Sequence, residues 1–170
     1  MLSEEEIKSK VYQLLEATQM GYEFPLPIEK IASYLGFTCH LYIPDEDIKD
    51  IASALSHTKK KIYVNQDNPI EQQLYTVARK IGHIVLHGDD RDYIHEAETT
   101  LTWQEKEAEI FAIHLLMPDH AFEAAWEKHK NDFNALANYF GVLPSMLAAK
   151  AASLKLNLPD LEKLSDSSNV

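Results

Sequence analysis

The sequence predicts an α+β fold, in which a small, largely antiparallel sheet lies beside two central helices and further helices surround them. Two long segments carry apolar residues at helical spacing, and three short segments in the first half alternate as strands do. The length of 170 residues, with 45% hydrophobic and 25% charged residues, is ordinary for one globular domain. We expect a single domain over residues 1–160 and a disordered polar tail over residues 161–170.

The first part of the chain predicts two amphipathic helices. Ser3 and Glu6 form a capping-box pattern ahead of apolar residues that share one helical face, and Gly21 ends this helix. Pro27 starts a shorter helix, and Gly36 suits the left-handed residue after its end. Core packing explains both helices.

Three β-strands are expected next, at residues 37–43, 51–57 and 61–65. The last two flank a turn at Thr58-Lys59-Lys60, so they pair as neighbours. This pairing is the reason for expecting a mainly antiparallel sheet.

The longest predicted helix has Asn68 as its cap and Pro69 as its first residue, and it runs to the start of an acidic segment, residues 88–100. A second long helix opens with the capping-box pattern at Thr102 and runs to Pro118. The acidic segment between these helices is predicted to be an exposed loop.

Three shorter helices are predicted over residues 121–128, 133–140 and 145–154. The last two have the order of a helix-turn-helix, a DNA-binding motif. Their second helix carries only Lys150 ahead of Lys155, which is too little positive charge for phosphate contacts. Packing against the core is the better explanation.

Charge and cysteine content narrow the functional classes. The formal net charge of −11 disfavours nucleic acid, so a protein partner is expected. The N-terminus is acidic rather than a basic leader, and no apolar run reaches membrane-spanning length. Cys39 is the only cysteine, which excludes an internal disulfide and a cysteine metal cluster. These features predict a cytoplasmic protein that is not bound to a membrane.

The candidate chemistry lies on the longest helix, which reads Ala78-Arg79-Lys80-Ile81-Gly82-His83-Ile84-Val85-Leu86-His87. Zinc peptidases of the zincin type place two His residues at i and i+4 of a helix, with a Glu directly after the first. This segment resembles the helix "aHELGHxLLH" of the ImmA/IrrE family of metallopeptidases. The run from Glu107-Ala108 to Met117-Pro118 resembles the family's second signature, "EAxxFAxxLLMP".

The resemblance implies a zincin-like core and a zinc site whose inherited ligands are His83 and Glu107. Arg79 and Lys80 stand where the family has its first His ligand and its catalytic Glu. Arginine has no lone pair to offer a metal, and a protonated lysine cannot take a proton from water. We therefore expect a pseudoenzyme with no resident cofactor, although zinc is the metal that could still bind.

Other interpretations of these residues stay open. The cation of Arg79 or Lys80 could occupy the former metal position and pair with Glu107. Glu107 could instead be a solvated acid in the first turn of its helix, where the helix dipole favours it. His87 could be a polar residue at a helix C-terminus, where histidine is also favourable.

A metal site shifted by one helical turn is a further alternative. It would use His83 and His87, which are also at i and i+4, together with Glu107 or a residue of the acidic segment. The candidates there are Asp89, Asp90 and His95. Because Ile84 follows the first ligand where the Glu base belongs, such a site would be structural or weakly hydrolytic.

Relatives of the ImmA/IrrE family are implied to be regulators, some of which cleave or inactivate repressors of phages and mobile elements. By this resemblance we expect a regulatory protein-binding module of the repressor or antirepressor type, which holds its partner in the former substrate cleft without hydrolysis. The alternative is an active zinc-dependent peptidase that cleaves a regulatory protein through the rearranged site at His83, His87 and Glu107.

Overall fold

The computed structural model describes residues 1–47, 51–88, 93–96, 102–129 and 132–156. Within these ranges it has seven helices and four strands, so the predicted α+β class is confirmed. In chain order they are α1 (Glu4–Thr18), α2 (Ile28–Tyr34), β1 (Thr38–Tyr42), β2 (Ile51–Ser56), β3 (Lys61–Asn65), α3 (Ile70–His87), β4 (Tyr93–Glu96), α4 (Trp103–Leu116), α5 (Asp119–His129), α6 (Phe133–Phe140) and α7 (Pro144–Ser153). No helix in these ranges has the length and apolar character needed to cross a membrane. The predicted tail, residues 161–170, lies outside the described residues.

The four strands form one sheet in the order β1-β3-β2-β4. β2 runs antiparallel to β3 and β4, whereas β1 is parallel to β3, so the sheet is largely antiparallel as predicted. β4 lies within residues 88–100, and the prediction that this segment is only a loop was wrong. Its four residues are too few to show strand alternation, and they are held by pairing with a strand some forty residues earlier.

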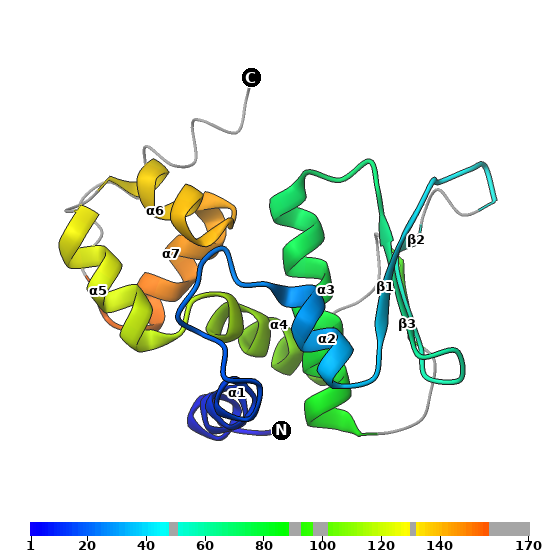
Figure 1. Ribbon diagram of the computed structural model, residues 1–170, viewed down its shortest axis with the longest axis horizontal. Helices are drawn as coiled ribbons and strands as arrows, with labels where there is room; N and C mark the ends of the chain where they lie inside the picture. The colour runs from blue at the N-terminus through cyan, green and yellow to red at the C-terminus, as the bar shows by residue number, and fades with distance from the viewer. Residues whose placement is uncertain (48–50, 89–92, 97–101, 130–131, 157–170) are drawn as a thin grey trace.

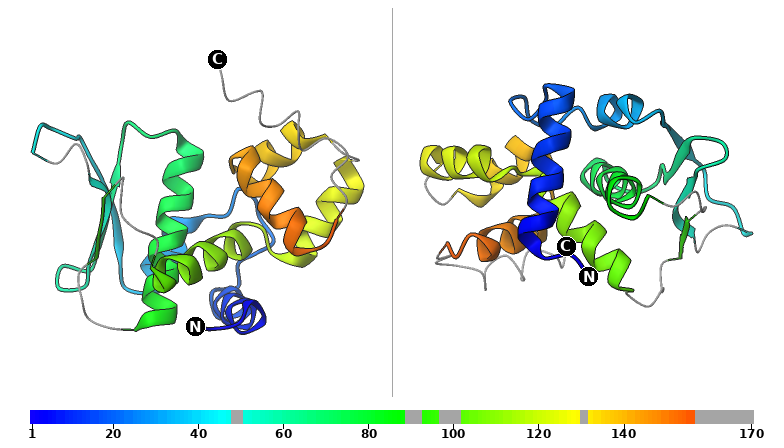
Figure 2. Two further views of the ribbon diagram at one scale, coloured as in Figure 1. Left: turned by 180° about the vertical axis from the view of Figure 1, so that it is seen from behind. Right: turned by 90° about the horizontal axis from the view of Figure 1, so that it is seen from below.

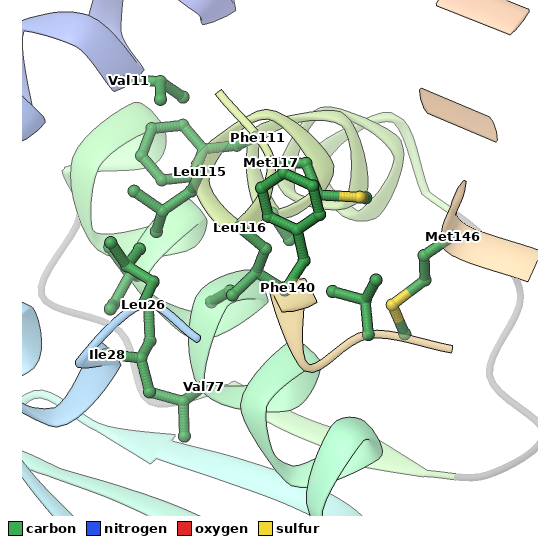
Figure 3. Close-up of a cluster of buried hydrophobic side chains, with 14 of the residues drawn as sticks. Val11, Leu26, Ile28, Val77, Phe111, Leu115, Leu116, Met117, Phe140 and Met146 are labelled. Carbon is green, nitrogen blue, oxygen red and sulfur yellow. The ribbon is translucent and has the colours of Figure 1, made fainter. Parts of the chain in front are cut away.

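The elements are arranged around the two central helices (Figure 1). The sheet lies on one side of α3, and α5, α6 and α7 lie on the other side, beyond α4; the view from behind shows the same order (Figure 2). One buried apolar cluster extends from α1 to α7, and Figure 3 shows its centre. The residues labelled there are Val11, Leu26, Ile28, Val77, Phe111, Leu115, Leu116, Met117, Phe140 and Met146.

Helix ends follow the predicted chemistry with two differences. The capping box of Ser3 and Glu6 is present at α1, and the hydroxyl of Thr102 accepts the Glu105 N–H at α4. Gln19, in the left-handed region, follows α1 before Gly21 is reached. At α3 the cap residue is Pro69 rather than Asn68, because the helix begins one residue later than predicted.

Gly82 allows α3 and α4 to approach closely. A Cβ at this position would lie 3.1 Å from the Cα and 3.2 Å from the carbonyl oxygen of Ala108. These are backbone atoms of α4, which cannot rotate aside as a flexible side chain can. The close contact between α3 and α4 therefore requires glycine at position 82. This contact also fixes the position of His83, the next residue of α3, relative to α4.

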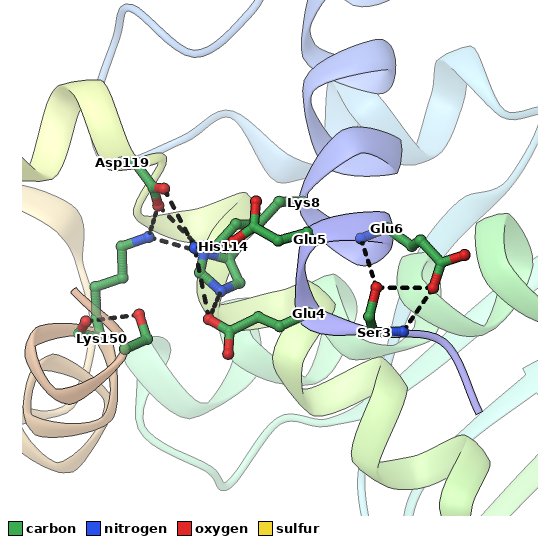
Figure 4. Close-up of polar contacts among 9 residues, drawn as sticks. Ser3, Glu4, Glu5, Glu6, Lys8, His114, Asp119 and Lys150 are labelled. Atoms are coloured by element: carbon green, nitrogen blue, oxygen red, sulfur yellow. Dashed lines mark hydrogen bonds and ion pairs between the residues drawn. The ribbon is translucent and has the colours of Figure 1, made fainter. Parts of the chain in front are cut away.

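A polar network, centred on the fully buried Lys150, joins α1, α4, α5 and α7 (Figure 4). Lys150 of α7, whose side chain is fully buried, donates to Asp119 of α5 and, at 2.8 Å, to Nδ1 of His114. His114 donates from Nε2 to Glu4 of α1 at 3.0 Å. Lys8 adds an ion pair with Asp119 at 3.5 Å. Because Lys150 is committed to this network, it is not available to contact phosphate, which agrees with core packing for α6 and α7.

Candidate functional site

The substituted motif lies on the buried face of α3. The exposed fractions are 8% for Arg79, 0% for Lys80 and 1% for His83. These residues occupy the middle of the helix, where one side faces the sheet and another faces α4. The two cationic substitutions are thus part of the protein interior, where an unpaired charge is strongly unfavourable.

Arg79 forms its ion pair with Glu105 of α4, its Nε lying 3.7 Å from Oε2 of that carboxylate. The guanidinium also lies 6.0 Å from the centre of the Tyr75 ring. Of the suggested pairing of Arg79 or Lys80 with Glu107, the Arg79 part is not what the structure shows, because the acidic partner of Arg79 is Glu105. The Glu107 carboxylate instead contacts Nε2 of His87 at 3.1 Å.

Lys80 has a fully buried ammonium group with no hydrogen-bond partner among the described residues. Burial lowers the pKa of Lys80 to about 8; the neighbouring charge of Arg79 also lowers it, and Glu105 acts in the opposite direction. The position that carries the catalytic base in the family signature thus carries a group that is mainly an ammonium at pH 7.

His83 contacts the same carboxylate as Arg79. Its Nε2 lies 3.1 Å from Oε1 of Glu105. Burial lowers the pKa of His83 below its ordinary value, although the hydrogen bond and charge of Glu105 act to raise it. Sequence reasoning missed Glu105 because its place three residues after Thr102 had already been explained by helix capping.

His87 and Glu107 form a second buried pair. Nε2 of His87 lies 3.1 Å from Oε2 of Glu107, and the backbone N–H of Leu2 donates to the other carboxylate oxygen. Because Glu107 is only 1% exposed, the interpretation of it as a solvated acid was wrong. His87 is the last residue of α3, where the helix dipole favours it, but it also has this specific partner.

The two imidazoles meet between these carboxylates. Nδ1 of His83 lies 3.1 Å from Nδ1 of His87, and the rings of His87 and Trp103 meet in an edge-to-face arrangement. The structure therefore brings together His83, His87 and Glu107, the three residues of the predicted shifted site. The side chains of Asp89, Asp90 and His95, the other candidates, lie outside the described residues.

These side chains do not fit the zinc site that the family signature implies. Within the described ranges, no group of three or more His, Cys, Asp or Glu side chains is arranged to hold a metal ion. The first ligand position is a guanidinium bound to Glu105, and the base position is an ammonium. Both bring positive charge to the place where the family signature has a neutral imidazole and a carboxylate.

Comparisons with known proteins agree with this fold. A family model described as the IrrE N-terminal-like domain, of peptidase family M78, matches residues 41–152. No curated protein matches the chain. A solved structure named as a Mycobacterium tuberculosis transcriptional regulator has a TM-score of 0.63 and 15% sequence identity, with 87% of this chain and 46% of that chain covered. The chain thus spans about half the length of that regulator, and the likeness shows a shared fold. On the family match over these residues, the chain belongs to the M78 peptidase family of IrrE N-terminal-like domains.

Proposed function

We propose that this chain is a catalytically inactive M78 protein that regulates by binding another protein, a repressor or other regulator, in the former substrate cleft. One observation carries the proposal. Lys80, fully buried, replaces the catalytic Glu, and the preceding Arg79 is held by Glu105. The substituted positions are thus built into the interior.

Hydrolysis would have to proceed without the groups that zincins use. The guanidinium of Arg79 has no lone pair for a metal, and the ammonium of Lys80 cannot activate water. Loss of a positioned base alone lowers a rate by about 10²–10⁴-fold, and loss of the metal also removes the activated water. These losses favour retention of the fold for binding rather than for catalysis.

A regulatory role is supported by the comparison with a solved chain named as a transcriptional regulator. The net charge of −11 makes a protein surface a better partner than nucleic acid. We also infer that residues 1–160 form one domain in a cytoplasmic protein. In support, α1 and α7 contribute to the same apolar cluster as α3 and α4.

The test begins with crosslinking in the source cell and identification of attached regulatory proteins by mass spectrometry. Each purified candidate is then mixed with the chain, and its affinity, its DNA binding and its intact mass are measured with and without one equivalent of Zn²⁺. The proposal expects saturable binding that changes DNA binding while the mass of the regulator stays constant. Cleavage of the regulator, or absence of binding to every candidate, would overturn it.

The alternative function is a zinc-dependent peptidase that cleaves a regulatory protein through His83, His87 and Glu107. The 3.1 Å contact between His87 and Glu107 favours this alternative, because it brings the residues together. Ile84, which follows His83, has no group to act as a base. In the same experiment, cleavage that depends on Zn²⁺ and is lost with His87→Gln would support the peptidase.

A further inference from the structure

The strand β1 lies at the end of the strand order, so in the part of the chain that the structure describes only β3 pairs with it. The N–H of Thr38 donates to the carbonyl of Lys60, and the carbonyl of Tyr42 accepts from the residue that follows β3. Backbone groups of alternate residues point to opposite edges of a strand. The N–H and C=O groups of Cys39 and Leu41 therefore point away from β3, toward the open edge of the sheet.

The same edge exposes apolar side chains on the face of the sheet that packs against the helices. Cys39 and Leu41 line a cavity together with Ile28 of α2 and Leu74 of α3. Leu41 is 62% exposed, and Ile43, which directly follows the strand, is 70% exposed. An edge strand with outward backbone groups and exposed apolar side chains is a template for pairing with another strand.

Charges of opposite sign flank β1 at its two ends. The lysines of residues 59–61 lie beside its start, because β3 begins there and runs parallel to β1. The ammonium of Lys60 lies 4.9 Å from the centre of the Phe37 ring, just before the strand. The acidic run of residues 45–47 follows the other end, exposed and on a segment that projects away from the helices (Figure 1). A second β1 running antiparallel would bring its acidic end to the lysines of the first.

We propose that β1 pairs antiparallel with β1 of a second copy of this chain, about a twofold axis at Leu41. In this register Leu41 lies opposite Leu41 of the second copy, and Cys39 lies opposite Ile43 of the second copy. These are the residues whose backbone groups point to the open edge, as the hydrogen-bonded pairs of an antiparallel ladder require. The same strand on both copies forms the contact, which closes a dimer with one sheet continuous across it.

The register also brings the flanking charges together. Asp45 of each copy lies opposite Phe37 of the other, whose ring is in contact with Lys60. This attraction, made twice, offsets part of the repulsion between two chains that each carry a net charge of −11. Because the apolar residues and the charges of this edge match the edge itself, a second copy fits better than an unrelated extended segment. The dimer does not depend on the binding of a regulator at α3, and either property can be absent without the other.

Sedimentation equilibrium of the full chain, from micromolar to sub-millimolar concentrations, tests the dimer. We expect a reversible equilibrium between monomer and dimer. Leu41→Lys should raise the dissociation constant by at least about 10-fold, because it places like charges directly opposite one another at the axis. The matched control is Tyr22→Lys, at an exposed aromatic residue between α1 and α2, which should leave the dissociation constant unchanged.

A charge exchange tests the contact between the two ends of the strands. Lys60→Glu and Asp45→Lys should each raise the dissociation constant, because each places like charges together. The double variant restores opposite charges and should recover most of the affinity. Circular dichroism establishes that each variant is folded.

Disulfide crosslinking tests the register. In Ile43→Cys the introduced residue has its Cα about 5.5 Å from that of Cys39 of the second copy, a separation that a disulfide can span. The two cysteines of one chain are about 13 Å apart along the strand, so they cannot pair with one another. A mild oxidant should therefore give covalent dimers of Ile43→Cys but not of the control Tyr22→Cys.

Two results would overturn the proposed dimer: a chain that is monomeric at every concentration, and a dimer that Leu41→Lys leaves unchanged and Ile43→Cys does not crosslink. If the chain is monomeric and Leu41→Lys abolishes regulator binding, the edge belongs to an extended segment of another protein instead.

Discussion

The Nε of Arg79 lies 3.7 Å from Oε2 of Glu105, with both side chains about nine-tenths buried. The positive charge of the Arg79 guanidinium thus compensates the negative charge of the Glu105 carboxylate, beside the position where the family signature places its metal. The same carboxylate contacts His83 through its other oxygen, so one acid connects the substituted ligand to the retained one. The consequences of this connection can be measured.

Arg79→Ala should lower the free energy of unfolding by about 2–4 kcal/mol, because it removes the guanidinium that pairs with the buried Glu105 carboxylate. Urea unfolding of Arg79→Ala, Glu105→Gln and the double variant forms a cycle that isolates the pair. A coupling free energy above about 0.5 kcal/mol is expected for residues in contact. Additive effects would mean that the ion pair contributes nothing to stability.

Lys80→Met should stabilise the fold at pH 7. The pKa of Lys80 falls from 10.5 to about 8 on folding, chiefly through burial, which corresponds to about 3 kcal/mol against the charged folded state. Because the folded chain binds this proton more weakly, the free energy of unfolding rises between about pH 8 and pH 10.5. In Lys80→Met the free energy of unfolding should not show this rise between about pH 8 and pH 10.5.

Other groups titrate in this range, so the difference between the two unfolding curves is the quantity to measure. Burial raises the pKa of Cys39 from 9.0 to about 11, which lowers stability between these values in both proteins and cancels in the difference. The control Lys59→Met removes an exposed lysine and should change stability by less than about 0.5 kcal/mol. If the free energies of unfolding of Lys80→Met and of the unaltered chain change in parallel with pH, the pKa of Lys80 is not lowered by folding.

The sequence was sufficient for most of the fold because its signals are local. Capping at Ser3 and Thr102 and apolar spacing depend on neighbours in the chain, and the structure has the helices they predict. β4 was missed because its partner strand is distant. Glu105 was missed for a related reason, since which acid faces Arg79 depends on how α3 and α4 cross.

Asp119→Asn should destabilise the four-helix polar network by about 1–3 kcal/mol, because it leaves the buried ammonium of Lys150 with a weaker partner. Burial acts to raise the pKa of Asp119, but its hydrogen bond and charge interaction with Lys150 outweigh this and lower the pKa. The contribution of Asp119 is therefore present above pH 3.8 and is lost as pH falls through the lowered pKa. Acid unfolding should begin at a higher pH in Asp119→Asn, and Lys150→Met in that background should restore part of the stability.

Gly82→Ala should destabilise the chain although alanine is the better helix former by about 1 kcal/mol. The added Cβ would lie 3.1 Å from the Cα of Ala108, so α3 and α4 must separate by a few tenths of an ångström. Ser9→Ala on the exposed face of α1 is the control, since a smaller propensity gain there meets no obstacle and should stabilise the chain slightly. A Gly82→Ala chain that is as stable as the control or more stable would show that the helix junction yields easily.

Restoring the family's residues at positions 79 and 80 tests whether α3 aligns with the family signature at these positions. Arg79→His together with Lys80→Glu gives α3 the two neutral or acidic groups it lacks, and removes both buried cations. We expect Zn²⁺ binding that requires His83 and Glu107, as the resemblance to the family implies. Zinc analysis after gel filtration measures it, and His83→Gln in the restored chain is the control. His87→Gln in the restored chain separates the family's site from the shifted site of the alternative function, because it should spare Zn²⁺ binding at the family's site. If His87→Gln abolishes Zn²⁺ binding in the restored chain, the metal is held by His83 and His87 and the alignment with the family signature is not supported.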